Sequence, residues 1–338
     1  MKAFVGVGIV GLGGISIVHE AGYQDDRRAK IVAMCDSDEE LARARARQYD
    51  AKAYTDFNDL IRDPAVDTVD ITLPHKLHYK VAKEAMQHGK NVIVEKPITL
   101  TYSEAADLIK ISKDSNTKFT VAENTRFVKL YQVVEKLLRE KKVGEIWLVR
   151  TLIAGSEVER LTDLNNWIRK KGSGGGIIID AGVHTFYLYK WLFGGVKSIH
   201  TFLWNRIKGT DVEDNAIMVG LLEGGAQFQA QLSDTAQSPW TERLEIYGSN
   251  GVIIGDQLSD PPLKIYEGPM ADEGQAVEGI EYNPAGWKAI SIMEEVKDFV
   301  GAVIEDRIPG VDPEDAAYAV KVAEMAYNNF SRLSENHD

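Results

Sequence analysis

Three side chains able to do acid–base chemistry stand in two short segments of the chain. The first is Lys96, which follows the apolar run VIVE at 92–95 and precedes Pro97. Pro97 disfavours the α region for the lysine, which therefore stays extended and points off the end of the predicted strand. An ammonium at that place could stabilise a developing alkoxide. The alternative is a surface lysine paired with Glu95, and base rates make the bond before Pro97 trans.

The other two side chains are Asp180 and His184, in the glycine-rich segment GSGGGIIIDAGVHTFYLYKWLFG at 172–194. Their i, i+4 spacing places them on one face if the segment is helical. A carboxylate beside an imidazole is an arrangement for general acid–base catalysis. The alternatives are a helix cap for Asp180 and a buried structural role for His184.

A phosphate-binding loop is predicted at 11–16, GLGGIS, between a predicted strand and a predicted helix. Gly11 makes the tight turn, Gly13 lets the backbone approach a pyrophosphate, and Ser16 takes the third small position. The helix N-terminus, from Gly14 and Ile15 onward, supplies N–H donors. The spacing therefore predicts a dinucleotide site.

A literal G-x-G-x-x-G match also exists at Gly6, Gly8 and Gly11. This register would shorten the first strand to a stub and place apolar Ile9 and Val10 in the phosphate loop. We therefore prefer the later register.

Asp36 ends the second predicted strand, 20 residues after Ser16. An acid there grips a ribose hydroxyl and repels a 2′-phosphate, which favours NAD over NADP. The alternative is that Asp36 caps the helix predicted at 38–49. Arg43 and Arg45 could still reach a phosphate, so NADP stays possible, although a solvated helix face is their more ordinary place.

The first half of the chain alternates between strand-like and helix-like segments, which predicts βαβ units and a doubly wound parallel sheet, an α/β fold of the Rossmann kind. The strands are predicted at 4–10, 30–36, 66–73, 91–95 and 118–123, and the helices at 15–25, 38–49, 56–62, 76–89 and 101–115.

The pattern changes after residue 126, where a long amphipathic helix is followed by strands with hairpin-turn residues between them. Strands are predicted at 145–154, 196–204, 214–224, 226–234, 243–249 and 251–256, and terminal helices at 286–306 and 314–333. We therefore expect a Rossmann domain at 1–126. A substrate-binding and oligomerisation α+β domain with a large, mostly antiparallel sheet is expected at 127–338.

Bulk composition narrows the function class. The chain has 338 residues, which suits two domains, and its net charge of −12 disfavours nucleic acid and anionic membranes as partners. No apolar run approaches the roughly 20 residues that span a bilayer. The Gly-rich start lacks a signal-peptide cleavage pattern, and Cys35 is the one cysteine. These features predict a cytoplasmic protein, and we expect no metal.

The motifs together resemble the Gfo/Idh/MocA oxidoreductases, the family of glucose–fructose oxidoreductase and inositol dehydrogenase. The resemblance covers nearly the whole chain. It rests on GIVGLGGIS with His19, LPHKLHYKVAKEAMQHGKNVIVEKP, AENTRF, GGGIIIDAGVH and WLFG. It implies that Lys96 of the EKP signature is catalytic and that Asp180 and His184 occupy the D-x-G-x-H positions. Two departures are Tyr187, where the family commonly has an acid, and His75, in place of an asparagine.

Site residues follow from the motifs and the resemblance. The expected cofactor contacts are Gly11, Gly13, Gly14, Ile15, Asp36, Ser37, Leu73, Pro74, His75, His78, Glu95 and Lys96. The expected substrate contacts are Lys96, Asn124, Arg126, Trp167, Arg169, Asp180 and His184, with Lys170 at the mouth. For the segment around Trp167, a solvated loop beside a packed tryptophan is the alternative.

The expected reaction is reversible hydride transfer between a nicotinamide and a carbinol carbon of a sugar, sugar acid or cyclitol. His184 would be the base, Lys96 would stabilise the alkoxide, and Asp180 would orient the imidazole or bind a hydroxyl. Two alternatives keep the fold: an NAD-dependent glycoside-cleaving enzyme and a non-enzymatic sugar- or nucleotide-sensing regulator. Partly apolar faces on the second sheet, and the resemblance, predict a homodimer or homotetramer.

Overall fold

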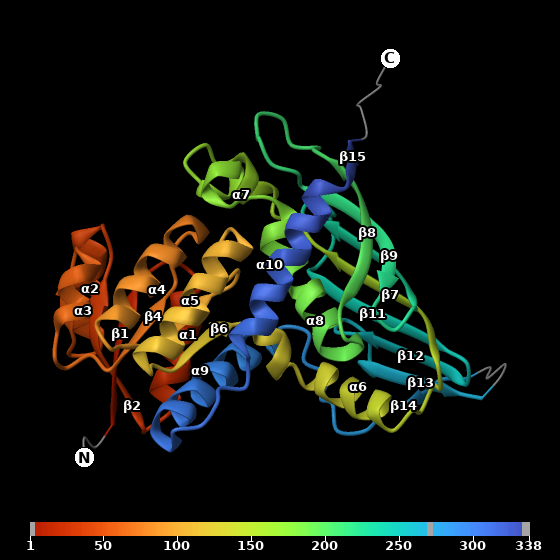
Figure 1. Ribbon diagram of the computed structural model, residues 1–338, viewed down its shortest axis with the longest axis horizontal. Helices are drawn as coiled ribbons and strands as arrows, with labels where there is room; N and C mark the ends of the chain where they lie inside the picture. Colours follow the sequence, from red (N-terminus) through yellow and green to blue (C-terminus); the bar gives the residue numbers. More distant parts are fainter. Residues whose placement is uncertain (1–3, 269–272, 333–338) are drawn as a thin grey trace. The chain divides into compact units, whose positions relative to one another are not determined.

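The computed structural model describes residues 4–268 and 273–332, and the chain separates into two compact units (Figure 1). The first unit is Met1–Phe127 with Lys288–Ala317, and the second is Val128–Trp287 with Tyr318–Asp338. Each unit contains a sheet of its own.

The sheet of the first unit is parallel throughout, with strand order β3-β2-β1-β4-β5-β6 in the described residues. Its strands are β1 (Val5–Val10), β2 (Ala29–Cys35), β3 (Lys52–Tyr54), β4 (Thr68–Ile71), β5 (Asn91–Glu95) and β6 (Phe119–Ala122). The order reverses between β1 and β4, so the carboxyl ends of these strands flank the crevice where such sheets bind ligands. The predicted doubly wound sheet is confirmed.

Three of the helices in this unit, α2, α3 and α5, begin at a residue whose side chain caps the helix. Asp38 accepts from the backbone N of Glu40 and Leu41, and Thr101 accepts from the N of Glu104. The helices are α1 (Ser16–Asp25), α2 (Glu39–Gln48), α3 (Phe57–Arg62), α4 (His78–Gln87) and α5 (Tyr102–Ser115), with short 3₁₀ turns η1 (His75–Leu77) and η2 (Asn124–Phe127).

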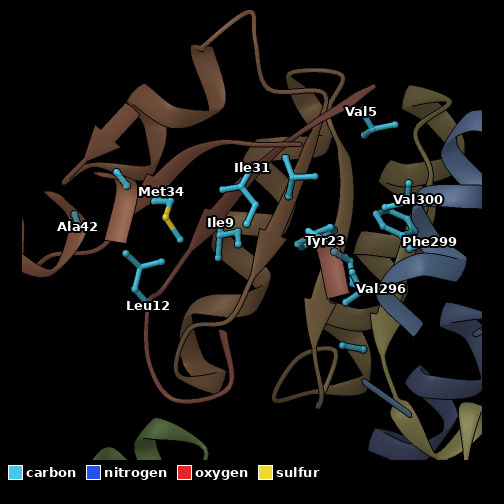
Figure 2. Packing of buried hydrophobic residues seen from close by; sticks show 14 residues of the cluster. Val5, Ile9, Leu12, Tyr23, Ile31, Met34, Ala42, Val296, Phe299 and Val300 are labelled. Carbon is cyan, nitrogen blue, oxygen red and sulfur yellow. The ribbon is translucent and has the colours of Figure 1, made fainter. Parts of the chain in front are cut away.

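The core of the first unit joins the sheet to a helix from far along the chain. Helix α9 (Trp287–Glu305) packs Val296, Phe299 and Val300 into one cluster with Ile9 and Tyr23 (Figure 2). The approach to α1 is close, because a Cβ added at Gly22 would lie 3.2 Å from the Cα of Met293. Glycine is the residue that permits such contact.

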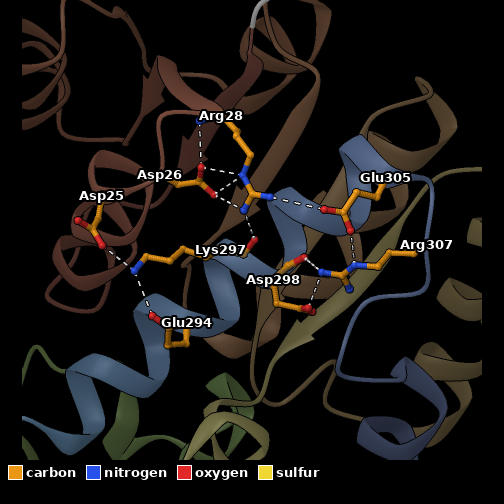
Figure 3. Close-up of polar contacts among 8 residues, drawn as sticks. All are labelled: Asp25, Asp26, Arg28, Glu294, Lys297, Asp298, Glu305 and Arg307. Carbon is orange, nitrogen blue, oxygen red and sulfur yellow. Dashed lines mark hydrogen bonds and ion pairs between the residues drawn. The ribbon is translucent and has the colours of Figure 1, made fainter.

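Ion pairs at the surface fasten the same helix. Lys297 Nζ lies 2.6 Å from an Asp25 oxygen, and Arg28 pairs with Asp26 at 2.7 Å while also reaching Glu305 on α9 (Figure 3). The sequence assigned all of 127–338 to the second domain, whereas 288–317 belong to the first unit. The reason is that apolar periodicity marks a helix without marking which sheet it covers.

The second unit holds a sheet ordered β14-β13-β12-β11-β7-β10-β9-β8-β15 in the described residues, antiparallel except for the β7–β10 and β8–β15 pairs. Its strands are β7 (Ile146–Ala154), β8 (Val196–Trp204), β9 (Asn215–Leu222), β10 (Gln227–Ser233), β11 (Thr241–Gly248), β12 (Gly251–Asp256), β13 (Leu263–Glu267), β14 (Gln275–Ala276) and β15 (Phe330–Arg332). The predicted mostly antiparallel second sheet is confirmed.

Helices cover one face of this sheet. They are α6 (Lys129–Arg139), α8 (Val183–Phe193) and part of α10 (Pro313–Asn328), whereas Leu161 of α7 (Val158–Thr162) packs with Ile168 and Val212. Tyr189 of α8 stacks edge-on against Phe228 of β10, with ring centroids 5.2 Å apart, and Leu130 of α6 lies against Gly255 of β12. Because neighbours along a strand alternate, the other face presents residues such as Val219 and Leu221.

Some boundaries differ from the sequence prediction. The last helix was predicted at 314–333, but α10 ends at Asn328, and residues 330–332 pair with β8 as strand β15. Strands β3, β13, β14 and β15 were not predicted. They are two to five residues long, and β3, β14 and β15 lie at sheet edges. Strands this short offer too few residues for an alternating pattern to show in the sequence.

Candidate functional site

The glycine loop leaves β1 at Gly11, whose φ is +93°. An added Cβ there would lie 2.7 Å from the carbonyl oxygen of Thr72, so only glycine fits the turn. The backbone N of Gly11 donates to the carbonyl of Cys35 at the end of β2. The loop is thereby held at the carboxyl edge of the sheet.

The next residues leave that edge open. Gly13 and Gly14 are exposed, and a Cβ added at either would meet nothing within 4 Å. Ser16 stabilises the loop, because its hydroxyl donates to the carbonyl oxygen of Gly13 at 2.8 Å. Helix α1 starts with no side-chain cap at Ile15 and no acid in its first turn. This open start suits the diphosphate of a dinucleotide.

Asp36 stands beside the loop at the end of β2. Its Oδ2 accepts from the N of Leu12 at 2.9 Å, and its Oδ1 accepts from the N of Asp38 at 3.0 Å. The cap of α2 is Asp38, so the alternative that Asp36 caps this helix is wrong. Asp36 instead ties the second strand to the glycine loop and stays partly exposed.

Arg43 and Arg45 on α2 are both paired with acids. Arg43 lies 2.5 Å from a carboxyl oxygen of Glu39, and Arg45 forms a mostly buried ion pair with Glu20 of α1. Arg45 therefore does not lie on a solvated face, as its place in the sequence suggested.

The segment after β4 carries Leu73, Pro74, His75 and His78 to the same edge. His78 is fully buried, with Nδ1 2.8 Å from the carbonyl of Pro97 and Nε2 2.8 Å from the carbonyl of Leu73. Burial lowers the pKa of His78, against the effect of these carbonyls. The sequence suggested a cofactor contact for His78, whereas the structure uses its ring to join two loops at the sheet edge.

Lys96 directly follows the carboxyl end of β5 and is partly buried. Its backbone N donates to Glu95 Oε2 at 3.0 Å, and Glu95 Oε1 lies 3.1 Å from His19 Nε2. Glu95 is thus held by the buried His19 ring. The alternative from the sequence was a surface lysine paired with Glu95, and Glu95 is not at the surface. The Lys96–Pro97 bond is cis, which proline permits although base rates alone favour trans.

Asn124 and Arg126 lie on η2, just beyond β6. The Asn124 amide is buried and donates to Ser291 Oγ of α9 at 2.8 Å. The structure therefore gives Asn124 a role in attaching α9, where the sequence had suggested a substrate contact.

In the second unit, Asp180 lies on a π-helical turn (Ile178–Gly182) and His184 in the first turn of α8, and both are partly buried. The turn begins at Gly176, whose φ is +112° and whose added Cβ would lie 2.6 Å from Glu213 Oε1. That oxygen also accepts from the N of Ile178 and from the Tyr327 hydroxyl. Such π turns occur often at functional sites.

The segment before the glycine run is packed rather than open. Arg169 is buried and donates to the carbonyls of Gly209 at 2.7 Å and Thr162 at 3.2 Å. Trp167 packs against a small apolar cluster that includes Ile168. These contacts favour the alternative of a packed tryptophan and give Arg169 a structural role, where the sequence had suggested a substrate contact. Tyr187, one of the departures from the family pattern, is buried in α8.

One acid beside this site was not singled out from the sequence. Asp234 follows β10, and its backbone N donates to the carbonyl of Asp214. Burial, followed by the negative charges of Asp180 and Glu157, raises the pKa of the Asp234 carboxyl to about 8. The sequence around Asp234 gives no signal of this role, because its pKa is raised by burial and by acids that are distant in the sequence.

Two searches of the described residues bear on other kinds of site. No group of three or more His, Cys, Asp or Glu side chains is arranged to hold a metal ion in that part of the chain. Nor does any helix there have the length and apolar character required to cross a bilayer.

Comparison with known families gives two matches. Residues 5–123 match the family described as an oxidoreductase family with an NAD-binding Rossmann fold, and residues 131–254 match the GFO/IDH/MocA C-terminal domain. The exposed Gly13–Gly14 turn, the uncapped helix start and Asp36 form the donor and acceptor set that such a fold offers to NAD.

Individual proteins are similar along most of their length. The chain is 25% identical to trans-1,2-dihydrobenzene-1,2-diol dehydrogenase of Xenopus tropicalis over 71% of each chain. It is 23% identical to myo-inositol 2-dehydrogenase of Thermotoga maritima over 93% of this chain and 92% of the other. The WlbA dehydrogenase of Bordetella pertussis, solved with NADH and UDP-GlcNAcA, superposes with a TM-score of 0.87, covering 97% of this chain and 96% of the other at 19% identity.

Proposed function

The chain belongs to the Gfo/Idh/MocA family of NAD-binding oxidoreductases, and from that premise we propose that it oxidises a secondary alcohol of a polyhydroxylated ring. The observation that carries the proposal is the placement of Lys96. It extends from the carboxyl end of β5, on the sheet edge that also bears the glycine loop after β1. Ligands of such sheets bind at this edge.

The division of labour follows from the chemistry. NAD supplies the hydride acceptor, and the chain must position the alcohol and manage one proton. Lys96 stabilises the negative charge that develops on the substrate oxygen. His184 accepts the hydroxyl proton on its imidazole and returns it in the reverse direction. Asp180 orients that imidazole or binds a neighbouring hydroxyl.

We assign NAD rather than NADP to this chain. Asp36 is fixed by Leu12 and Asp38 at the place where a ribose hydroxyl binds, and its charge opposes a 2′-phosphate. Arg43 and Arg45, the nearest candidates to hold that phosphate, are paired with Glu39 and Glu20. The names of two relatives support a hydroxylated ring as substrate class, one acting on myo-inositol and one on a ring diol.

The test is a screen of sugars, sugar acids and inositols with NAD and NADP, followed by nicotinamide absorbance. We expect reduction of NAD with at least one compound. Lys96→Ala and His184→Ala should each lower kcat/KM roughly 100- to 10,000-fold while NAD still binds. Activity close to the parent in either variant would remove that residue from its role.

The screen also separates the two alternatives. A free sugar released without net NADH would indicate glycoside cleavage through transient oxidation. Normal NAD binding with no turnover across the panel would indicate a sensing protein.

We further propose that the chain forms a homodimer or homotetramer through the second sheet. Val219 and Leu221 on β9 are 39% and 38% exposed on the face away from α8, so the sheet offers apolar surface to a second copy. A cytoplasmic location is also proposed, supported by the single cysteine.

A further inference from the structure

A set of ionisable side chains lies buried behind Lys96 in the first unit. They come from segments far apart in the sequence: α1, β4, α4, the ends of β5 and β6, and α9. The titratable groups that face one another there are His19, Tyr23, Asp70, His78, Glu95, Lys96, Glu123 and Glu295. His19 and Asp70 are fully buried, so their charges have no access to solvent.

The centre of this cluster is the ring of His19. Its Nδ1 lies 2.9 Å from Asp70 Oδ2, and its Nε2 lies 3.1 Å from Glu95 Oε1. Carboxylates only accept hydrogen bonds, so both ring nitrogens donate only when the ring is an imidazolium. Burial alone would lower the pKa of His19, but Asp70 and Glu95 outweigh burial and hold it well above its ordinary value.

Glu95 connects this ring to the active lysine. Burial would raise the pKa of Glu95, but the His19 bond, the charge of His19 and the charge of Lys96 lower it below the ordinary value. The second Glu95 oxygen accepts from the backbone N of Lys96 at 3.0 Å. Glu95 is therefore an ionised carboxylate held in a fixed orientation. The attraction between the two charges is mutual, so Glu95 also favours the charged form of Lys96.

We propose that His19, held as an imidazolium between Asp70 and Glu95, is a positioning residue that keeps Glu95 ionised against the main chain of Lys96. The ionised Glu95, held by buried side chains of the first unit, thereby favours the charged form of the Lys96 side chain. This role deepens the proposed function and rests on it, because it concerns the lysine that stabilises the substrate oxygen.

The first test is His19→Gln, which removes the cation while leaving a hydrogen-bond donor of similar size. Asp70 then lacks this cation and Glu95 keeps the charge of Lys96 but not that of His19, so Glu95 holds a proton more readily and favours the ammonium less. We expect the alkaline limb of the kcat profile to move about one pH unit lower, with NAD affinity unchanged. The matched control is His88→Gln at the C-terminal cap of α4, an exposed histidine outside the cluster, which should leave the profile unchanged.

A second measurement does not depend on turnover. The Lys96 ammonium can be titrated by NMR in protein with isotope-labelled lysine and no cofactor, with the signal assigned through Lys96→Arg. In His19→Gln its midpoint should fall by about the same one unit. An unchanged midpoint and an unchanged alkaline limb in a folded variant would overturn the proposal.

Two other results of these experiments also bear on the proposal: a His19→Gln variant that does not fold, and a parent protein without turnover. If His19→Gln does not fold, Asp70→Asn is measured instead, because it removes one partner of the imidazolium with little change of size. A Lys96 midpoint equal to that of the parent in a folded Asp70→Asn variant would then overturn the proposal. If the parent turns over nothing but its Lys96 midpoint still falls on His19→Gln, the proposed function fails and the coupling stands.

Discussion

At the scale of single residues, hydrogen bonds from neighbouring groups orient the polar side chains of the candidate site. Asp36 keeps both oxygens on backbone N–H groups, and this orients the carboxylate at the end of β2. Asn124 is oriented toward Ser291 of α9. The side chains of Arg169 and His78 are each oriented toward two backbone carbonyls. Their predicted ligand contacts stay predictions, and the structure adds a protein partner for each of these side chains.

Cofactor preference is tested at Asp36. Asp36→Asn keeps an oxygen for the N of Leu12 but loses the charge, so NAD affinity should fall about tenfold or more while NADP affinity holds or improves. The measurement is the dissociation constant of each cofactor by fluorescence titration. Asp38→Asn is the matched control, because asparagine caps α2 equally well and should leave both constants unchanged. An unaltered NAD to NADP ratio in Asp36→Asn would contradict the assignment.

At the scale of elements, α9 brings a buried acid into the first unit. Both carboxyl oxygens of Glu295 are buried and have no hydrogen-bond partner among the described residues. Burial, together with the charges of Glu95, Glu123 and Asp70 and against that of His19, raises the pKa of Glu295 well above its ordinary value. The protonated form of this carboxyl is therefore favoured in the folded state over a wider pH range than in the unfolded chain.

This acid makes stability depend on pH. Below about pH 4 the group is protonated in both states and contributes no difference. As pH rises above the unfolded pKa of about 4.3, the unfolded chain ionises while the folded chain does not, so the folded state loses stability.

Glu295→Gln should remove that loss. We expect the variant to match the parent at pH 4 and to unfold at a higher temperature than the parent at pH 8, by at least about 1 kcal/mol in free energy. Thermal or urea unfolding across this pH range measures the difference. A constant offset at all pH values would show that Glu295 does not titrate as described.

At the scale of the whole molecule, the second sheet has helices on one face and exposed apolar residues on the other. Thr151, Tyr189 and Phe228 join α8 to the covered face. On the other face, Val219 and Leu221 project from a central strand rather than an edge. Apolar surface there is available to a copy of the same chain.

The double change Val219→Lys and Leu221→Lys tests this arrangement. Light scattering after gel filtration should give the parent a mass of at least twice 37.5 kDa and the variant a mass near that of one chain. Ile304→Lys on α9, which alters an exposed apolar side chain of the first unit, is the matched control and should behave as the parent. A parent of single-chain mass at micromolar concentration would refute the proposed oligomer.

The sequence by itself determined the parallel sheet, the glycine loop with Asp36 beside it, and the position of Lys96 at a strand end. These features are local: periodicity defines each strand and helix, and the carboxyl ends of parallel strands meet at one edge. It also placed Asp180 and His184 on one short stretch, although the π turn that holds Asp180 was not predicted.

Packing in three dimensions was needed to show that α9 belongs to the first unit and that His19 bridges Asp70 and Glu95. The same holds for the burial of Glu295 with no hydrogen-bond partner among the described residues. His19 and Glu95 are 76 residues apart, and their contact depends on how α1 packs against the sheet. Burial and the charges brought near by that packing set the protonation of these groups. No spacing along the chain records which distant side chains share an interior, because packing selects them by shape and volume.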